Sequence, residues 1–163
     1  NVMLMGDTND DGTDTVTLYE RATGTFYIKN TNSAGNADTT VQFGPVPGGE
    51  VIPYLADVTG NGATIGYYTP SEGRYRGRNT NTPGSAQYNV RYGPKGANIT
   101  PFMADVDGDG LDEPAFHDRT VGRFCARNTL SGGGSDLIVR YGPANDPDII
   151  PFLASAEGCT PDP

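Results

Sequence analysis

Apolar and polar residues alternate along short stretches of this chain, which is the pattern of half-buried β-strands. Val16 and Leu18 stand two residues apart, as do Phe26 and Ile28, with polar residues or turns around them. In the first third of the chain, the pattern predicts strands over residues 15–19, 25–29, 40–43 and 51–55. Glycines and other turn formers separate these stretches, and no segment has the pattern of a convincing helix.

The same pattern recurs along the chain, at a spacing of about 49 residues. Residues 24–31, 73–80 and 122–129 each begin with Gly and end with Asn-Thr. An aromatic-Gly-Pro turn follows at 43–45, 92–94 and 141–143. A third motif, Pro-aromatic-apolar-Ala, occupies 53–56, 101–104 and 151–154, and residues 3–7 match it loosely. Three motifs in one register indicate an internal repeat.

The repeat predicts an all-β fold of β-propeller-like tandem units of about 49 residues, each with four antiparallel strands. We expect a single repeat domain over residues 1–163, with units at 2–52, 53–100 and 101–150 and an extra strand and tail at 151–163. Propellers close with about four to eight blades, so three units leave open sheet edges. The chain is therefore expected to be part of a longer protein, or to complete its sheets with neighbouring copies.

Composition narrows the class of protein further. Only 35% of the 163 residues are hydrophobic, whereas 23 are Gly and 13 are Pro, which suits many short strands and tight turns. The net charge of −9 argues against nucleic-acid binding. No apolar run reaches the ~18 residues of a membrane span. The chain starts at Asn1 without a visible leader, so we expect a processed secreted protein or an internal fragment.

Candidate chemistry lies in the loop that follows the Pro-aromatic-apolar-Ala motif in the third unit. Asp105, Asp107, Asp109 and Glu113 supply oxygen ligands at loop positions 1, 3, 5 and 9, and the Leu111 carbonyl adds a backbone ligand. Calcium prefers six to eight hard oxygens, several of them carboxylates. Predicted strands flank the loop and position 12 is not Glu, so an EF-hand is rejected.

Two related loops stand in the earlier units. The first is expected to bind calcium through Asp7, Asn9 and Asp11, with further oxygens from Thr13, Asp14 and Thr15. The second has a single carboxylate, so we expect a weak or empty site at Asp57, Thr59 and Asn61. An acidic loop alone is often a solvated turn, but recurrence at one place in a repeat favours calcium.

The two cysteines, Cys125 and Cys159, suggest one disulfide and an oxidising compartment. Cys159 stands in the tail, where a fourth loop would have a calcium ligand. We expect a Cys125–Cys159 disulfide to hold the tail in place of that ion. Two unpaired thiols are the alternative.

The segments 6–15, 17–19 and 24–30, together with the aromatic-Gly-Pro turns, resemble the bacterial FG-GAP/VCBS-type repeats, which are similar to the calcium-binding blades of integrin α-chain propellers. The resemblance covers nearly the whole chain. It implies a propeller-like blade, an extracellular or cell-surface location, and calcium held by Asp7, Asn9, Asp11, Asp105, Asp107, Asp109 and Glu113. The second loop departs from the pattern by losing most of its acids. The resemblance does not define a ligand.

No catalytic residue is predicted. His117 is the only histidine, and a structural role in its strand is favoured over catalysis. Several arginines lie in the strands of the later units, among them Arg74, Arg76 and Arg78. They are interpreted as a solvated face paired with acids. The alternative is a contact surface with Tyr75, Tyr88 and Tyr92 for acidic glycans or another subunit.

The sequence therefore predicts a noncatalytic extracellular calcium-binding module for adhesion or structural assembly. We expect a homo-oligomer or polymer, joined through open β-edges as a ring or filament. A glycan-binding propeller segment and an accessory domain of a secreted hydrolase remain the alternatives. No nucleic acid and no membrane span are expected.

Overall fold

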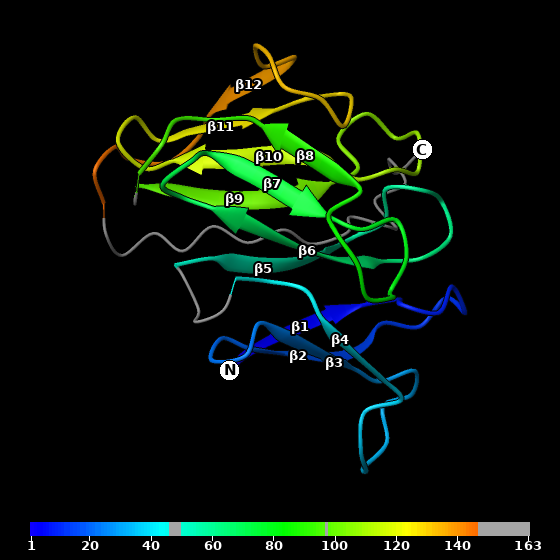
Figure 1. The fold of residues 1–163 in the computed structure, drawn as a ribbon. Coiled ribbons are helices and arrows are strands. Elements are labelled where there is room, and N and C mark those ends of the chain that lie inside the picture. Colours follow the sequence, from blue (N-terminus) through cyan, green and yellow to red (C-terminus); the bar gives the residue numbers. More distant parts are fainter. Residues whose placement is uncertain (46–49, 97, 147–163) are drawn as a thin grey trace.

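The computed structural model describes residues 1–45, 50–96 and 98–146. In this part of the chain all regular structure is β, in three four-stranded antiparallel sheets (Figure 1). The expectation of an all-β fold with antiparallel strands in groups of four is confirmed. No helix in the described residues is long and apolar enough to cross a membrane.

Each sheet is a meander, in which consecutive strands are neighbours. The first sheet contains β1 (Val2–Gly6), β2 (Thr15–Glu20), β3 (Thr25–Ile28) and β4 (Thr39–Gln42). The second contains β5 (Ile52–Ala56), β6 (Thr64–Thr69), β7 (Arg74–Gly77) and β8 (Tyr88–Arg91). The third contains β9 (Ile99–Ala104), β10 (Glu113–Asp118), β11 (Arg123–Ala126) and β12 (Leu137–Arg140).

The assignment of strands to units differs from the sequence prediction at one point. Residues 51–55 were expected to form the fourth strand of the first unit, but β5 pairs with β6 and begins the second sheet. The fourth strand of the first sheet is β4, which pairs with β3. Local alternation locates a strand but does not tell which neighbour it pairs with, because pairing is a long-range choice.

The three sheets lie one after another, and Figure 1 shows them as successive layers that do not close into a ring. Strands β1 and β5 are in contact, as are β5 and β9, so the first strands of the sheets adjoin one another. The described residues therefore do not form a closed propeller. The extra strand and tail expected at 151–163 lie outside the described residues, and the propeller interpretation stays a prediction.

Apolar side chains fill the two spaces between the sheets. Between the first and second sheets lie Tyr19, Phe26, Ile28, Val41 and Phe43 from one side and Val51 and Ile65 from the other. Between the second and third sheets, the buried residues include Tyr68, Tyr75, Val90 and Tyr92, which meet Ile99, Met103, Phe116 and Cys125. Tyrosines supply much of this buried area, which compensates for the low hydrophobic content of the chain.

A row of four residues across the second sheet shows how the large rings fit. The register pairs Tyr54 with Gly66, Gly66 with Gly77, and Gly77 with Tyr88. A Cβ atom at Gly66 would lie within 3.0 Å of the Tyr54 ring, and one at Gly77 would clash with the Tyr88 ring in the same way. The two rings thus lie over the glycines, and their hydroxyl oxygens are 3.3 Å apart. These glycines are required by close packing.

Candidate metal centre

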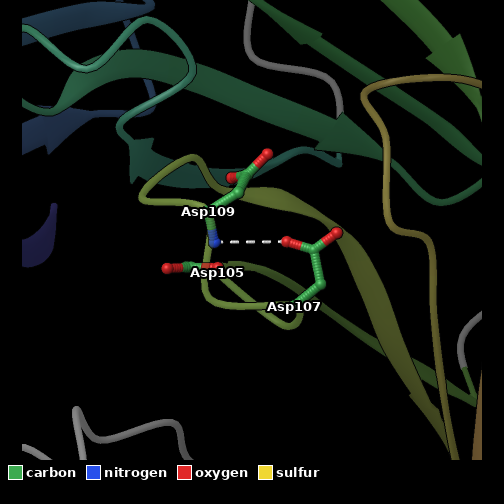
Figure 2. A group of neighbouring side chains, drawn as sticks. All are labelled: Asp105, Asp107 and Asp109. Carbon is green, nitrogen blue, oxygen red and sulfur yellow. Dashed lines mark hydrogen bonds between the residues drawn. The ribbon is translucent and has the colours of Figure 1, made fainter.

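The loop between β9 and β10 brings three carboxylates together. Oxygen atoms of Asp105, Asp107 and Asp109 all lie within 4.8 Å of one another (Figure 2). Among the His, Cys, Asp and Glu side chains of the described residues, these form the one group of three that could hold a metal ion. Carboxylate oxygens at this spacing suit a hard divalent cation such as calcium.

Backbone amides give this loop its shape. The Asp105 carboxylate accepts hydrogen bonds from the amides of Gly108 (2.7 Å) and Gly110 (3.0 Å), which curl the loop around it. Asp107 accepts from the amide of Asp109 at 3.3 Å, as Figure 2 shows, and Asp109 accepts from the amide of Leu111 at 2.9 Å. Gly110 has a φ of 88°, a conformation that side chains other than glycine rarely adopt.

Glu113, predicted as the ligand at position 9, begins β10 and is 3% exposed. Its carboxylate accepts a hydrogen bond from the amide of Val106 at 3.3 Å. Burial, together with the smaller effect of the charges of Asp107, Asp109 and Asp105, raises the pKa of Glu113 to about 7. A buried carboxylate beside three other carboxylates needs a positive partner or a proton.

This arrangement predicts a dependence of stability on pH. In chelator, the free energy of unfolding should fall as pH rises from 4.5 to about 7, because the folded Glu113 keeps a proton that the unfolded chain has lost. Glu113→Gln should remove this part of the slope, since glutamine does not ionise. Urea titrations across this pH range measure it. Identical slopes for the two proteins would contradict the assignment.

The first loop, between β1 and β2, has a related shape. Asp7 accepts hydrogen bonds from the amides of Asp11 (3.1 Å) and Gly12 (2.7 Å), and the Asn9 side-chain amide donates to Asp11 at 2.9 Å. The hydrogen bond from Asn9 is the main reason that the pKa of Asp11 is lowered. Asp7, Asn9 and Asp11 therefore lie around one turn.

The other residues predicted for the first loop differ in their surroundings. The amide of Thr13 donates to the Asp11 carboxylate at 2.9 Å, so Thr13 belongs to the same turn. Thr15 is buried, and its hydroxyl donates to the Lys29 carbonyl at 2.6 Å, which directs this side chain into the sheet. Asp14 lines a hollow between the first two loops.

The second loop, between β5 and β6, is closed by hydrogen bonds to one carboxylate. Asp57 accepts from the amides of Thr59 (3.1 Å), Gly60 (2.7 Å) and Gly62 (3.2 Å). The Asn61 amide also donates to the Asp57 carboxylate at 3.3 Å, and the Asn61 side chain donates to the Thr59 carbonyl at 3.0 Å. The loop keeps the turn but has only one carboxylate, and the weak or empty site expected there stays a prediction.

Asp112 connects the second and third loops, a role that the motif comparison missed. Its amide donates to the Asp57 carbonyl at 2.6 Å, and its carboxylate accepts from the Asp57 amide at 2.7 Å. Burial raises the pKa of Asp112, and the nearby charges of Asp57 and Asp105 add to this effect. It lines a hollow of about 470 Å³ together with Asp7, Asp10, Asp14 and Asp57. Asp112 is equivalent in the repeat to Asp14 and Ala63, and this equivalence is the sequence feature that could have identified it.

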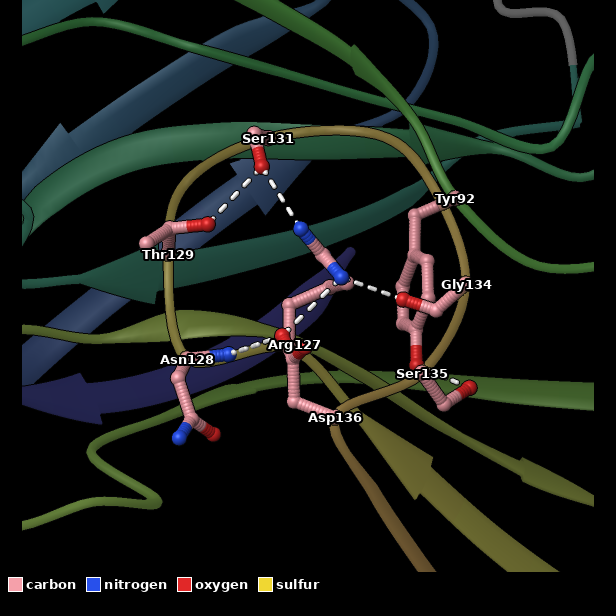
Figure 3. A network of polar contacts seen from close by, with 8 residues as sticks. All are labelled: Tyr92, Arg127, Asn128, Thr129, Ser131, Gly134, Ser135 and Asp136. Carbon is pink, nitrogen blue, oxygen red and sulfur yellow. Dashed lines mark hydrogen bonds and ion pairs between the residues drawn. The ribbon is translucent and has the colours of Figure 1, made fainter.

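The arginines hold loops of the protein itself. Figure 3 shows Arg127 inside the loop between β11 and β12, where it donates to Ser131 at 3.0 Å and forms an ion pair with Asp136 at 2.9 Å. Arg76 pairs with Glu72 in the second sheet, and Arg78 is buried and donates to the Ser85 carbonyl. Arg76 and Arg127 are paired with acids as expected, whereas Arg78 is buried and does not belong to a solvated face.

The alternative surface of arginines and tyrosines is contradicted by burial. Tyr75, Tyr88 and Tyr92 are at most 9% exposed and belong to the core between the second and third sheets. Tyr92 donates to Ser135 at 2.8 Å across these sheets (Figure 3). Sequence alternation placed these rings on a strand face but did not show that another sheet covers that face.

His117 and Cys125 lie inside the third sheet. His117 is 2% exposed, its ring lies 4.5 Å from that of Phe124, and its Nδ1 atom has no hydrogen-bond partner. Burial lowers its pKa, and the charge of Arg119 lowers it further. Cys125 is buried in β11. Its expected partner Cys159 lies outside the described residues, so the disulfide stays a prediction.

No protein-family model, curated protein or solved structure matches the chain. The resemblance to FG-GAP/VCBS-type repeats thus rests on the motifs of the sequence itself.

Proposed function

We propose that this chain is a noncatalytic, extracellular calcium-binding module that serves in adhesion or structural assembly. The observation that carries the calcium proposal is the convergence of Asp105, Asp107 and Asp109 to within 4.8 Å. The buried Glu113 beside them is the fourth carboxylate, and the turn of the first loop offers a second set of oxygens. Calcium would neutralise these carboxylates and hold the loop ends of neighbouring strands together.

A binding role is favoured over catalysis by the state of the only histidine. His117 is buried against Phe124, and its Nδ1 atom has no hydrogen-bond partner. A histidine that acts as a general base must reach both a substrate and an orienting partner. Acidic residues are the other candidates for catalysis, and most of those in the described residues lie in the loops described above. This grouping favours ion binding as their role.

Calcium titration by calorimetry tests the proposal. The protein should bind calcium at the third loop, and Asp107→Asn combined with Asp109→Asn should weaken this site at least about tenfold, or about 1.4 kcal/mol. The reason is the loss of two charged ligands with little change in shape. Glu50→Gln is the control for loss of a negative charge, because Glu50 is an exposed acid outside the three loops. Equal calcium binding by the double variant and the control would contradict the site.

A further inference from the structure

The first sheet has exposed apolar side chains on the face that points away from the second sheet. Met3, Met5 and Leu18 are 67%, 51% and 40% exposed. They share this face because the register pairs Met3 with Leu18 and Met5 with Val16. The opposite face of the same sheet, with Tyr19, packs against the second sheet. Exposed apolar residues grouped on one face are typical of a contact surface.

The third sheet also has exposed apolar side chains, on its face that points away from the second sheet. Leu137 and Val139 in β12 are each 43% exposed, and Tyr141 just beyond the strand is 77% exposed. An apolar hollow of about 160 Å³ lies beside them, lined by Phe102, Ala104, Val106, Ala115, Phe124, Cys125, Ala126 and Leu137. The register places Val139 opposite Phe124 and Leu137 opposite Ala126, so these side chains share one face of the sheet.

The two junctions inside the molecule show how such faces fit together. At the first junction, the ring of Phe43 packs against that of Tyr67 with centroids 5.2 Å apart. At the second, Tyr92 packs against Phe116 at 5.1 Å. In each case the aromatic residue after the fourth strand of one sheet meets the second strand of the next sheet. The same contact therefore recurs about 49 residues along the chain.

The exposed faces of the third and first sheets carry residues equivalent to the two partners of this contact. One further step of about 49 residues leads from Tyr92 to Tyr141, which is the exposed aromatic residue of the third sheet. A step back from Tyr67 leads to Leu18, which is the exposed apolar residue of the first sheet. The third sheet therefore presents the face that receives a next sheet, and the first sheet presents the face that docks.

Two more features of the internal junctions have equivalents on the exposed faces of the first and third sheets. Ile65 and Pro114 are fully buried at the two junctions, and Val16 holds the same place in the first sheet, next to Met5. The loops also join through the backbone, since the amide of Ala63 donates to the Asp7 carbonyl at 2.6 Å and Asp112 repeats this bond to Asp57. The corresponding groups at a third junction are the Asp14 amide and the Asp105 carbonyl.

We propose that the first sheet of a second copy of this chain stacks face to face on the third sheet, with Leu18 of one copy against Tyr141 of the other. Val16 would then cover the apolar hollow. One chain carries both complementary faces, which is why the proposed occupant is another copy. The contact is heterologous, so repetition gives a ring if the rotation closes and a filament if it does not. This deepens, and rests on, the assembly part of the proposed function, and it joins sheet faces rather than the open edges expected from the sequence.

Sedimentation velocity on the full chain in calcium tests the contact. The wild type should assemble as its concentration rises, and Leu18→Glu and Val139→Glu should each weaken assembly by about tenfold or more, because a charge is buried without a partner. Leu18 lies in β2, an inner strand, so its substitution separates face contact from edge pairing. Ala34→Glu, in an exposed loop, is the control for added charge. Circular dichroism and thermal melting verify that the variants are folded.

Mixing the two variants gives the sharpest result. Each variant keeps one intact face, so an equimolar mixture should form a dimer at a concentration at which each variant alone is monomeric. A wild type that stays monomeric at all concentrations would overturn the proposal, as would a mixture without dimer. Assembly unaffected by Leu18→Glu would also overturn it and indicate edge pairing. Calcium binding is measured in the same samples, so its failure is distinguished from failure of the contact.

Discussion

Chelation of calcium should lower the melting temperature of this protein by several degrees. Binding to the folded state alone contributes RT ln(1 + [L]/Kd), about 2.7 kcal/mol at a hundredfold excess of calcium over Kd. For a chain of this size, each kcal/mol corresponds to about 2–4 °C. The four carboxylates of the third loop repel one another without the ion, so its removal destabilises the loop ends of β9 and β10. Differential scanning calorimetry in calcium and in chelator measures the shift.

The effect of Asp107→Asn on the melting temperature should depend on whether calcium is present. In calcium the variant should melt below the wild type because a charged ligand is lost. In chelator it should melt at the same temperature or higher, because one of the crowded negative charges is gone while the side-chain oxygen that accepts from Asp109 remains. The control Glu50→Gln, outside the three loops, should respond to calcium as the wild type does. Wild-type melting temperatures that are equal in calcium and chelator would refute calcium binding.

Replacing Gly66 or Gly77 by alanine should destabilise the second sheet by about 1–3 kcal/mol each, the usual cost of overpacking. A Cβ at either position would overlap the ring of Tyr54 or Tyr88. The rings have little room to move, because both are only 9% exposed and the Tyr54 hydroxyl donates to the Arg76 carbonyl at 3.2 Å. Urea denaturation in calcium measures the loss.

The third sheet suggests a matched rescue for this prediction. Its equivalent row is Phe102, Ala115, Ala126 and Leu137, in which alanines replace the glycines and a leucine replaces the second tyrosine. Gly77→Ala combined with Tyr88→Leu copies this solution and should recover part of the lost stability. Gly134→Ala is the control, since a Cβ there meets nothing within 4 Å. A Gly77→Ala protein as stable as the wild type would show that the packing of the Tyr88 ring does not require glycine at position 77.

Much of the local structure was determined by the sequence alone. Alternation of residues such as Phe26 and Ile28 located the strands, because a strand that is buried on one face needs a period of two. Asp105, Asp107 and Asp109 were identified from spacing, because a tight turn brings alternate side chains to one point. Both features depend on neighbours in the chain, which is why they can be predicted without a fold.

Only the tertiary structure decided which strands share a sheet and which faces are covered. Strand β5 pairs with β6 and so belongs to the second sheet. Tyr75 and Tyr88 are buried because the third sheet packs over them. The burial of Glu113 and the connection made by Asp112 also depend on loops from different sheets. These outcomes are contacts between residues far apart in sequence, where the free energy of packing selects one arrangement among several that local alternation allows.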